Sequence, residues 1–99
     1  MQRFLTLSAL ALFGALPAMA STTFTATLEA PKSETERIAA ADAIWICEGE
    51  TCEAVLNRRS ATVRVCRHVV SEIGPVTAFG TAEDPLTPEE VSECNASLN

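Results

Sequence analysis

The sequence predicts an α+β fold, in which a small antiparallel sheet of three to four strands is combined with two helices and stapled by two disulfides. Three observations predict this class. Apolar residues alternate with threonine near residue 25, as in a half-buried strand. Apolar residues then recur at helical spacing after residue 60. Finally, an even number of cysteines, four, follows a leader-like N-terminus.

The first 20 residues have the composition of a cleavable export signal. Arg3 supplies a positive charge, and Phe4 to Leu16 form a mostly apolar stretch of 13 residues. An Ala-x-Ala sequence ending at Ala20 places small residues at the two positions that a signal peptidase recognises before its cleavage site. Thirteen residues are too few to span a bilayer, which takes about 20. We therefore expect a signal peptide at 1–20, no membrane span after its removal, a single domain at 21–99, and a periplasmic or secreted protein.

The expected mature chain is acidic. The full sequence has 13 acidic and 7 basic residues, and loss of Arg3 changes the formal net charge from −6 to −7. Negative charge repels the phosphate backbone, so the composition argues against generic nucleic-acid binding.

The segment before residue 60 reads as strands and turns. Thr22 to Glu29 alternates as a half-buried strand, Pro31 ends it, and Lys32 to Glu36 is expected to be a charged linker. The run Ala43 to Cys47 is apolar on both faces, so we expect it to be the central strand, although the alanines before it fit a helical turn equally well. Thr51 to Leu56 is expected to be its partner strand.

The period becomes helical from Ser60, which is expected to cap the first turn. Gly74 and Pro75 end this helix, and Val76 to Phe79 is expected to be a short strand. The predicted apolar face comprises Val63, Cys66, Val69, Val70 and Ile73, and the polar face comprises Arg64, Arg67, His68 and Ser71.

The last helix has the clearest start signal in the chain. Thr87 is expected to be the N-cap, with proline at the first helical position and Glu90 completing a capping box. Leu86 and Val91 are spaced for a hydrophobic staple across this start. Val91, Cys94 and Leu98 are expected on one side of the helix.

The cysteines are Cys47, Cys52, Cys66 and Cys94. Outside the cytoplasm they indicate disulfides, because so small a core is marginal alone. Cys47 and Cys52 flank a four-residue loop between two apolar runs, which places them across a hairpin mouth. Cys66 and Cys94 each lie on the apolar face of a predicted helix. Local spacing therefore favours these two pairs. Loop entropy slightly favours the crossed pairings, so all three connectivities stay open.

Several features of the sequence occur together. They are the leader, Thr-Phe-Thr-Ala-Thr-Leu-Glu-Ala-Pro at 23–31, the Trp-x-Cys-x4-Cys segment at 45–52, a cysteine in a helix ending Ile-Gly-Pro at 73–75, and Cys94-Asn95. In this combination the chain resembles a family of small exported proteobacterial four-cysteine proteins of unknown function. The resemblance implies a periplasmic location and two disulfides. It implies no activity and no active residues.

The cysteine spacing does not indicate a metal or redox site. Zinc would need close Cys-x2-Cys pairs, whereas the spacings here are four, 13 and 27 intervening residues. Thioredoxin-type chemistry would need Cys-x-x-Cys at a helix start. We therefore expect no metal and no cofactor.

His68 is the one histidine in the chain, so a serine or cysteine hydrolase would have to use it as the base. It is expected beside Arg64 and Arg67, whose charges disfavour the protonated form that such a base must reach. A solvated helix residue, paired with Glu72 one turn later, is the favoured interpretation. We therefore name no catalytic residue.

The basic residues Arg58, Arg59, Arg64 and Arg67 are clustered within ten positions. Guanidinium groups so placed could hold a phosphate or carboxylate of an envelope component. The favoured alternative is an ordinary charged face, whose arginines pair with some of the 13 acidic groups.

These observations favour a non-catalytic periplasmic binding or interaction module, whose partner is an unknown protein or an anionic envelope component. Two alternatives remain. One is a small secreted enzyme inhibitor that presents Glu48 to Thr51 inside its disulfide ring, and the other is a hydrolase that uses His68. The sequence does not identify an activity, a ligand or an oligomeric state.

Overall fold

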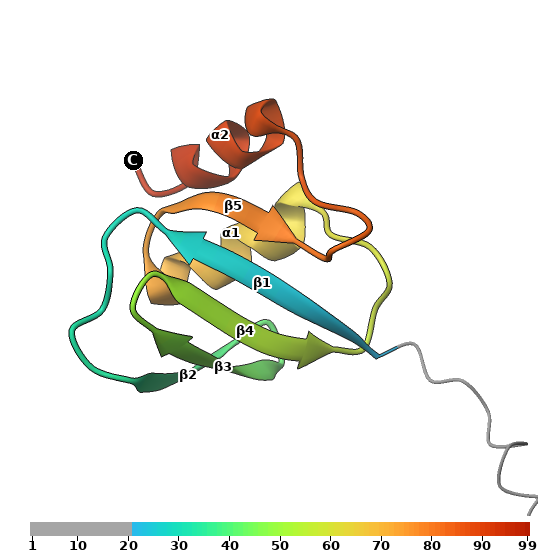
Figure 1. The fold of residues 1–99 in the computed structure, drawn as a ribbon. Helices are drawn as coiled ribbons and strands as arrows, with labels where there is room; N and C mark the ends of the chain where they lie inside the picture. Colours follow the sequence, from blue (N-terminus) through green and yellow to red (C-terminus); the bar gives the residue numbers. More distant parts are fainter. Residues whose placement is uncertain (1–20) are drawn as a thin grey trace, which may run out of the picture.

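The computed structural model describes residues 21–99, so the expected export signal at 1–20 lies outside the described residues. It has an α+β fold with five strands and two helices, one strand more than the upper limit of the expectation (Figure 1). In residues 21–99, no helix has the length and apolar content that crossing a membrane requires. The elements in chain order are β1 (Thr22–Leu28), β2 (Glu36–Ala40), β3 (Ala43–Glu48), β4 (Thr51–Leu56), α1 (Val63–Ile73), β5 (Val76–Gly80) and α2 (Pro88–Ala96).

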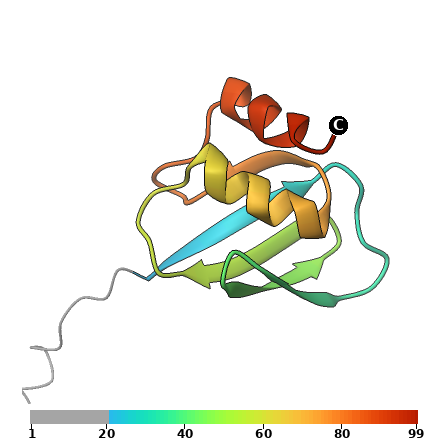
Figure 2. The same cartoon turned by 180° about the vertical axis from the view of Figure 1, so that it is seen from behind.

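The five strands form one antiparallel sheet in the order β2-β3-β4-β1-β5. The central strand is therefore β4, and the expectation that Ala43 to Cys47 is central was wrong. Both helices lie on one face of this sheet, as Figures 1 and 2 show from opposite sides. Because only one face is covered, β3 buries Trp45 and Cys47 while Ile44 and Ile46 on its other face stay exposed.

The strand that the sequence analysis missed is β2. It begins at Glu36 and pairs with β3 through a two-residue turn at Ala41 and Asp42. Both turn residues have positive φ, 52° and 59°, which is the pattern of a type I′ hairpin turn. Asn-Gly is the usual signal for this turn, and neither residue is present here. For this reason the charged residues up to Glu36 were interpreted as a linker, and the alanines that follow fitted a helical turn as well as a strand.

Helix α1 starts two residues later than expected. Its N-cap is Thr62, whose hydroxyl accepts a hydrogen bond from the Val65 N–H at 3.1 Å, and Ser60 is not the cap. The two hydroxyl residues have similar capping ability, so sequence could not separate them. Gly74 ends the helix with φ of 99°, a region that favours glycine. Val63, expected on the buried face, is only partly buried, and Val65 is buried instead.

Helix α2 has the expected capping box between Thr87 and Glu90. Leu86 and Val91, which were expected to form a staple across this start, are both buried. Leu98 was expected on the buried side with Cys94, and this was wrong, because its side chain is 42% exposed. The helix ends at Ala96, so Leu98 no longer follows helical periodicity.

The core lies between the sheet and the helices. Trp45 is fully buried there, and its ring nitrogen donates to the Ala40 carbonyl at 3.1 Å. Phe79 contacts both Trp45 and Phe24, with ring centroids 5.9 Å apart in each pair.

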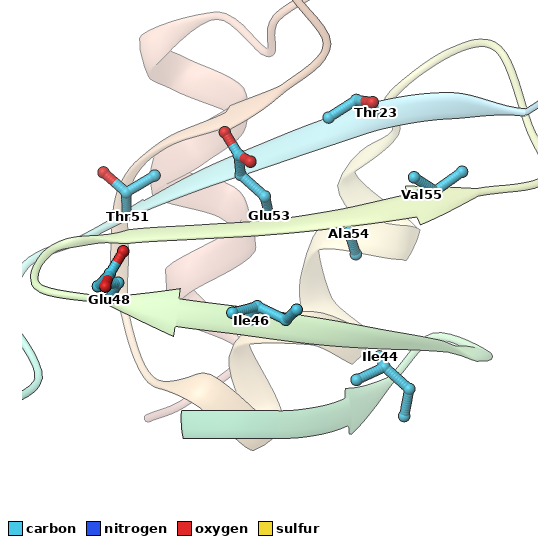
Figure 3. Close-up of a pocket in the computed structure, with 8 residues that line it drawn as sticks. All are labelled: Thr23, Ile44, Ile46, Glu48, Thr51, Glu53, Ala54 and Val55. Atoms are coloured by element: carbon cyan, nitrogen blue, oxygen red, sulfur yellow. The ribbon is translucent and has the colours of Figure 1, made fainter. Parts of the chain in front are cut away.

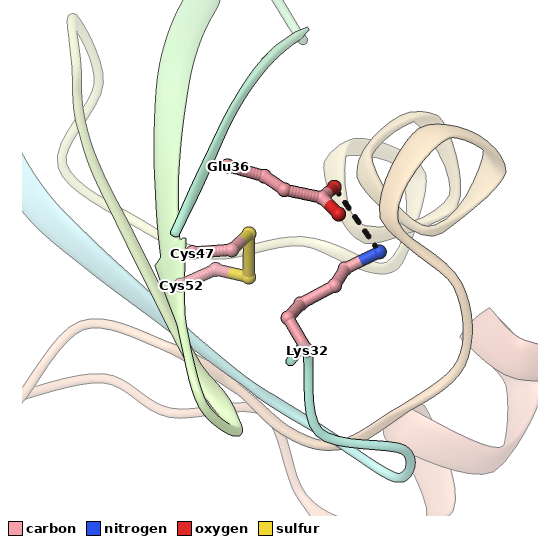
Figure 4. A network of polar contacts seen from close by, with 4 residues as sticks. All are labelled: Lys32, Glu36, Cys47 and Cys52. Atoms are coloured by element: carbon pink, nitrogen blue, oxygen red, sulfur yellow. Dashed lines mark ion pairs between the residues drawn. A yellow bond between two sulfur atoms is a disulfide. The ribbon is translucent and has the colours of Figure 1, made fainter. Parts of the chain in front are cut away.

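The structure has two disulfides, Cys47–Cys52 and Cys66–Cys94, which is the pairing that local spacing favoured. The first joins directly paired residues of β3 and β4 on the buried face of the sheet. It lies beside the Lys32–Glu36 ion pair (Figure 4). The second ties α1 to α2 and so holds the C-terminal helix against the body of the domain.

Candidate functional site

The face of the sheet that no helix covers carries three large exposed aliphatic side chains. Ile44 and Ile46 extend from β3 and are 49% and 45% exposed, and Val55 extends from β4 and is 62% exposed. We call these three residues the open-face patch. They are exposed because residues of a strand alternate between faces, and their neighbours Trp45 and Ala54 point into the core.

A hollow of about 730 Å³ lies over this patch (Figure 3). Two carboxylates lie along it, because Glu53 pairs with Ile46 across β3 and β4, and Glu48 pairs with Thr51 at the hairpin end. Thr23 lies opposite Val55 on β1. The hollow is lined by Thr23, Ile44, Ile46, Glu48, Thr51, Glu53, Ala54 and Val55.

This site combines an apolar surface with an acidic end, and the lining holds no histidine, cysteine or serine. Such a surface can bind another apolar surface, and its two glutamates favour positive charge beside it. This site was not predicted from the sequence. The apolar character of Ala43 to Cys47 on both faces was interpreted as burial on both sides, whereas both helices lie on the same face of the sheet.

The structure brings two of the four clustered arginines together. Arg58 and Arg64 line a second hollow of about 550 Å³, with His68 and Asp42 also in its lining. The lining of that hollow does not include Arg59 or Arg67. All four arginines are exposed. Among residues 21–99, the ion pair found joins Lys32 to Glu36 at 3.6 Å and involves none of these arginines.

His68 lies on the exposed side of α1. The nearby Ser71 hydroxyl donates to the backbone carbonyl of His68 at 2.7 Å, so this hydrogen bond does not activate the hydroxyl through the ring. The expected ion pair between His68 and Glu72 is not found in the described part of the chain.

The loop at Glu48 to Thr51 is shorter than expected, because both strands extend into it and leave a two-residue turn at Gly49 and Glu50. Gly49 has φ of 63°, as the first position of a type II′ turn requires. Both carbonyls of the turn accept hydrogen bonds, one from the β1–β2 connection and one from the last residue of β1. The Gly49 carbonyl accepts from the Lys32 N–H at 2.8 Å, and the Glu50 carbonyl accepts from the Leu28 N–H at 2.7 Å.

No cluster of three or more metal-ligating side chains occurs within residues 21–99. In the comparisons with known proteins, the sequence model described as a family of unknown function (DUF8200) matches residues 7–96. No curated protein and no solved structure matches the chain.

Proposed function

Because the chain belongs to the family of unknown function DUF8200, which brings no activity with it, we propose from the geometry that it is a non-catalytic module that binds another protein through the open-face patch. The observation that carries this proposal is the exposure of Ile44, Ile46 and Val55 together on the uncovered face. Burial of a half-exposed aliphatic side chain contributes about 1 kcal/mol, so the patch supports a moderate contribution to binding.

The acidic end of the hollow sets the chemistry of the partner. Glu48 and Glu53 lie next to the patch and have no ion-pair partner in residues 21–99. A protein surface that combines apolar side chains with lysine or arginine is therefore complementary to the site. The leader-like N-terminus and the two disulfides support a partner in the periplasm or outside the cell.

Site-specific photocrosslinking in native host cells tests this proposal. A photoreactive residue in place of Val55 should yield discrete protein adducts, and Ile46→Glu in the same chain should remove them, since it places a charge in the apolar contact. A photoreactive residue in place of Ser71, on the exposed side of α1, is the matched control and should yield none. Equal adducts from both positions, or adducts that survive Ile46→Glu, would reject the open face as the binding site.

An anionic envelope group is the second candidate ligand. Its support is the hollow that Arg58 and Arg64 line together with His68. Asp42 lines the same hollow and would repel an anion, which is why we rank this ligand second. Replacement of Arg58 and Arg64 by serine should weaken envelope association in a salt-dependent manner, whereas Asp42→Asn should strengthen it. Unchanged fractionation of the Arg58→Ser, Arg64→Ser and Asp42→Asn variants would contradict this ligand.

The two remaining alternatives have less support. A protruding inhibitory loop would need a free turn, whereas the Gly49 carbonyl is bonded to Lys32 in the β1–β2 connection and the Glu50 carbonyl to Leu28 at the end of β1. A hydrolase would need a nucleophile against the His68 ring, and the Ser71 hydroxyl is bonded to a backbone carbonyl.

A further inference from the structure

The two edges of the sheet differ, and the β5 edge is closed by the chain itself. The Leu86 N–H donates to the Phe79 carbonyl at 2.9 Å. The Asn95 side chain bonds both backbone groups of Val76, accepting from its N–H at 3.0 Å and donating to its carbonyl at 2.7 Å. Gly80 forms a bridge with Pro85, and a Cβ on Gly80 would lie 2.6 Å from the Pro85 Cα. Three backbone groups of β5, the Phe79 carbonyl and the N–H and C=O of Val76, are thus occupied and cannot pair with another strand.

The β2 edge lacks such a cover. The pair Ala40 and Ala43 closes a two-residue turn, so it is a hydrogen-bonded pair. Antiparallel pairs alternate, so Ile38 also bonds to β3, whereas the N–H and C=O groups of Arg37 and Ala39 point away from β3. The pairing of β3 with β4 agrees with this alternation. Ile46 is paired with Arg37 on β2 and with Glu53 on β4, and its backbone groups bond to Glu53.

These outward groups are available for pairing. Arg37 and Ala39 are both exposed. Among residues 21–99, no backbone hydrogen bond from outside the sheet reaches either residue. The sheet therefore ends at β2 with the donors and acceptors of two residues unpaired, on the same strand that borders the open face.

We propose that β2 accepts an extended segment of the partner protein as a sixth, antiparallel strand. The segment would exchange two hydrogen bonds with Arg37 and two with Ala39. The side chains of Arg37 and Ala39 lie opposite Ile46 and Ile44, so the added strand also extends the open-face patch. This inference rests on the proposed function, because it names how the partner of that same face is held.

The side chains along β2 specify the segment. A carboxylate opposite Arg37 forms an opposite-charge cross-strand pair, and a β-branched apolar residue opposite Ala39 covers Ile44. Because the added strand is antiparallel to β2, the residue opposite Ala39 precedes the residue opposite Arg37 in the sequence of the segment. The segment therefore reads apolar, any residue, acidic.

A second copy of this chain fits the edge less well. Each expected mature chain carries a formal net charge of −7, since removal of Arg3 lowers the value of −6, and two such chains repel each other. In a two-fold pairing about Ile38, Arg37 of each copy would face Ala39 of the other and gain no opposite charge.

The test uses the disulfide-bonded protein and a synthetic acetylated peptide, Thr-Thr-Val-Thr-Glu-Thr-Thr, with binding and amide hydrogen exchange followed by NMR. The Arg37 and Ala39 amides should exchange at least tenfold more slowly at saturating peptide. Ala39→Pro should weaken binding at least tenfold, because it removes an outward N–H but no bond to β3. Ala39→Ser retains this N–H and is the matched control. Circular dichroism checks that each variant is folded.

Charge reversal gives an independent measurement that does not involve proline. Arg37→Glu should weaken binding of the glutamate-containing peptide. A peptide with lysine in place of that glutamate should restore binding to the Arg37→Glu variant. Lack of binding at millimolar peptide, equal binding by Ala39→Pro, or slowed exchange only at other amides would overturn strand addition. Concentration-dependent protection of Arg37 and Ala39 without peptide, together with a dimer on size-exclusion chromatography, would overturn it in favour of a second copy.

The experiments also separate this inference from the proposed function. If photocrosslinks at Val55 require Ile46 but survive Ala39→Pro, the open face binds its partner and strand addition is wrong. If Ile46→Glu leaves the photocrosslinks unchanged, the proposed function is wrong, and this inference, which rests on it, falls as well.

Discussion

At the scale of the residue, Asn95 joins α2 to β5 through two hydrogen bonds. Its amide bonds both backbone groups of Val76, a residue that is fully buried. Asn95→Ala leaves a buried N–H and a buried C=O without partners, which should lower the free energy of unfolding by about 2 kcal/mol. Urea denaturation measures this loss. Asn99→Ala at the exposed C-terminus is the control and should change the value little.

Asn95→Asp sharpens the same prediction. The carboxylate can still accept from the Val76 N–H but cannot donate to the Val76 carbonyl, so it should restore only part of the stability. A loss below 0.5 kcal/mol for Asn95→Ala would show that water replaces the amide, contrary to this account. The contact spans 19 positions in the sequence, and no local pattern predicts it.

At the scale of the element, the β2–β3 turn places alanine where glycine or asparagine is usual. Ala41 has φ of 52°, which costs a residue with a Cβ about 1–2 kcal/mol. Ala41→Gly removes that cost. It also increases the conformational entropy of the unfolded chain, which destabilises the fold by about 0.4–1 kcal/mol. The net effect should be a stabilisation of the domain by about 0.5–1 kcal/mol. Thermal unfolding should show a melting temperature a few degrees higher.

A second alanine of the same hairpin serves as the matched control. Ala39 lies within β2, where the backbone is extended and alanine is unstrained. Ala39→Gly should therefore destabilise by about 0.5–1 kcal/mol, opposite in sign to the effect at Ala41. Equal signs for the two variants would contradict the strain assigned to the turn.

The elements that sequence predicted correctly carry local signals. Thr87 and Glu90 form a capping box whose geometry needs only neighbouring residues, and the structure contains it. Strand β2 has no such signal, because its turn contains neither asparagine nor glycine, and the contacts that hold it are its pairing with β3 and the hydrogen bond from Trp45 to Ala40. The open-face patch was missed for a related reason. Which face of β3 is covered depends on where α1 and α2 pack, and strand alternation does not encode this.

At the scale of the whole molecule, the two disulfides should differ in their contribution to stability. Cys66–Cys94 closes a longer loop than Cys47–Cys52, with sequence separations of 28 and 5. Chain-entropy estimates are about 3.6 and about 2.2 kcal/mol respectively. Paired Cys→Ala variants at 66 and 94 should therefore lose more stability in urea than those at 47 and 52. The reverse order would show that α2 is held mainly by packing.

The unequal sheet edges also limit how these molecules can aggregate. Growth of a β-stacked fibre requires each incoming unit to pair on one side and to offer a fresh template on the other. In residues 21–99, Leu86 and Asn95 already occupy three of the backbone groups of β5 on which such a template depends, the Phe79 carbonyl and both groups of Val76. A molecule that joined such a stack through β2 would therefore cap it. Filament extension would stop at that unit unless the C-terminal segment first detached.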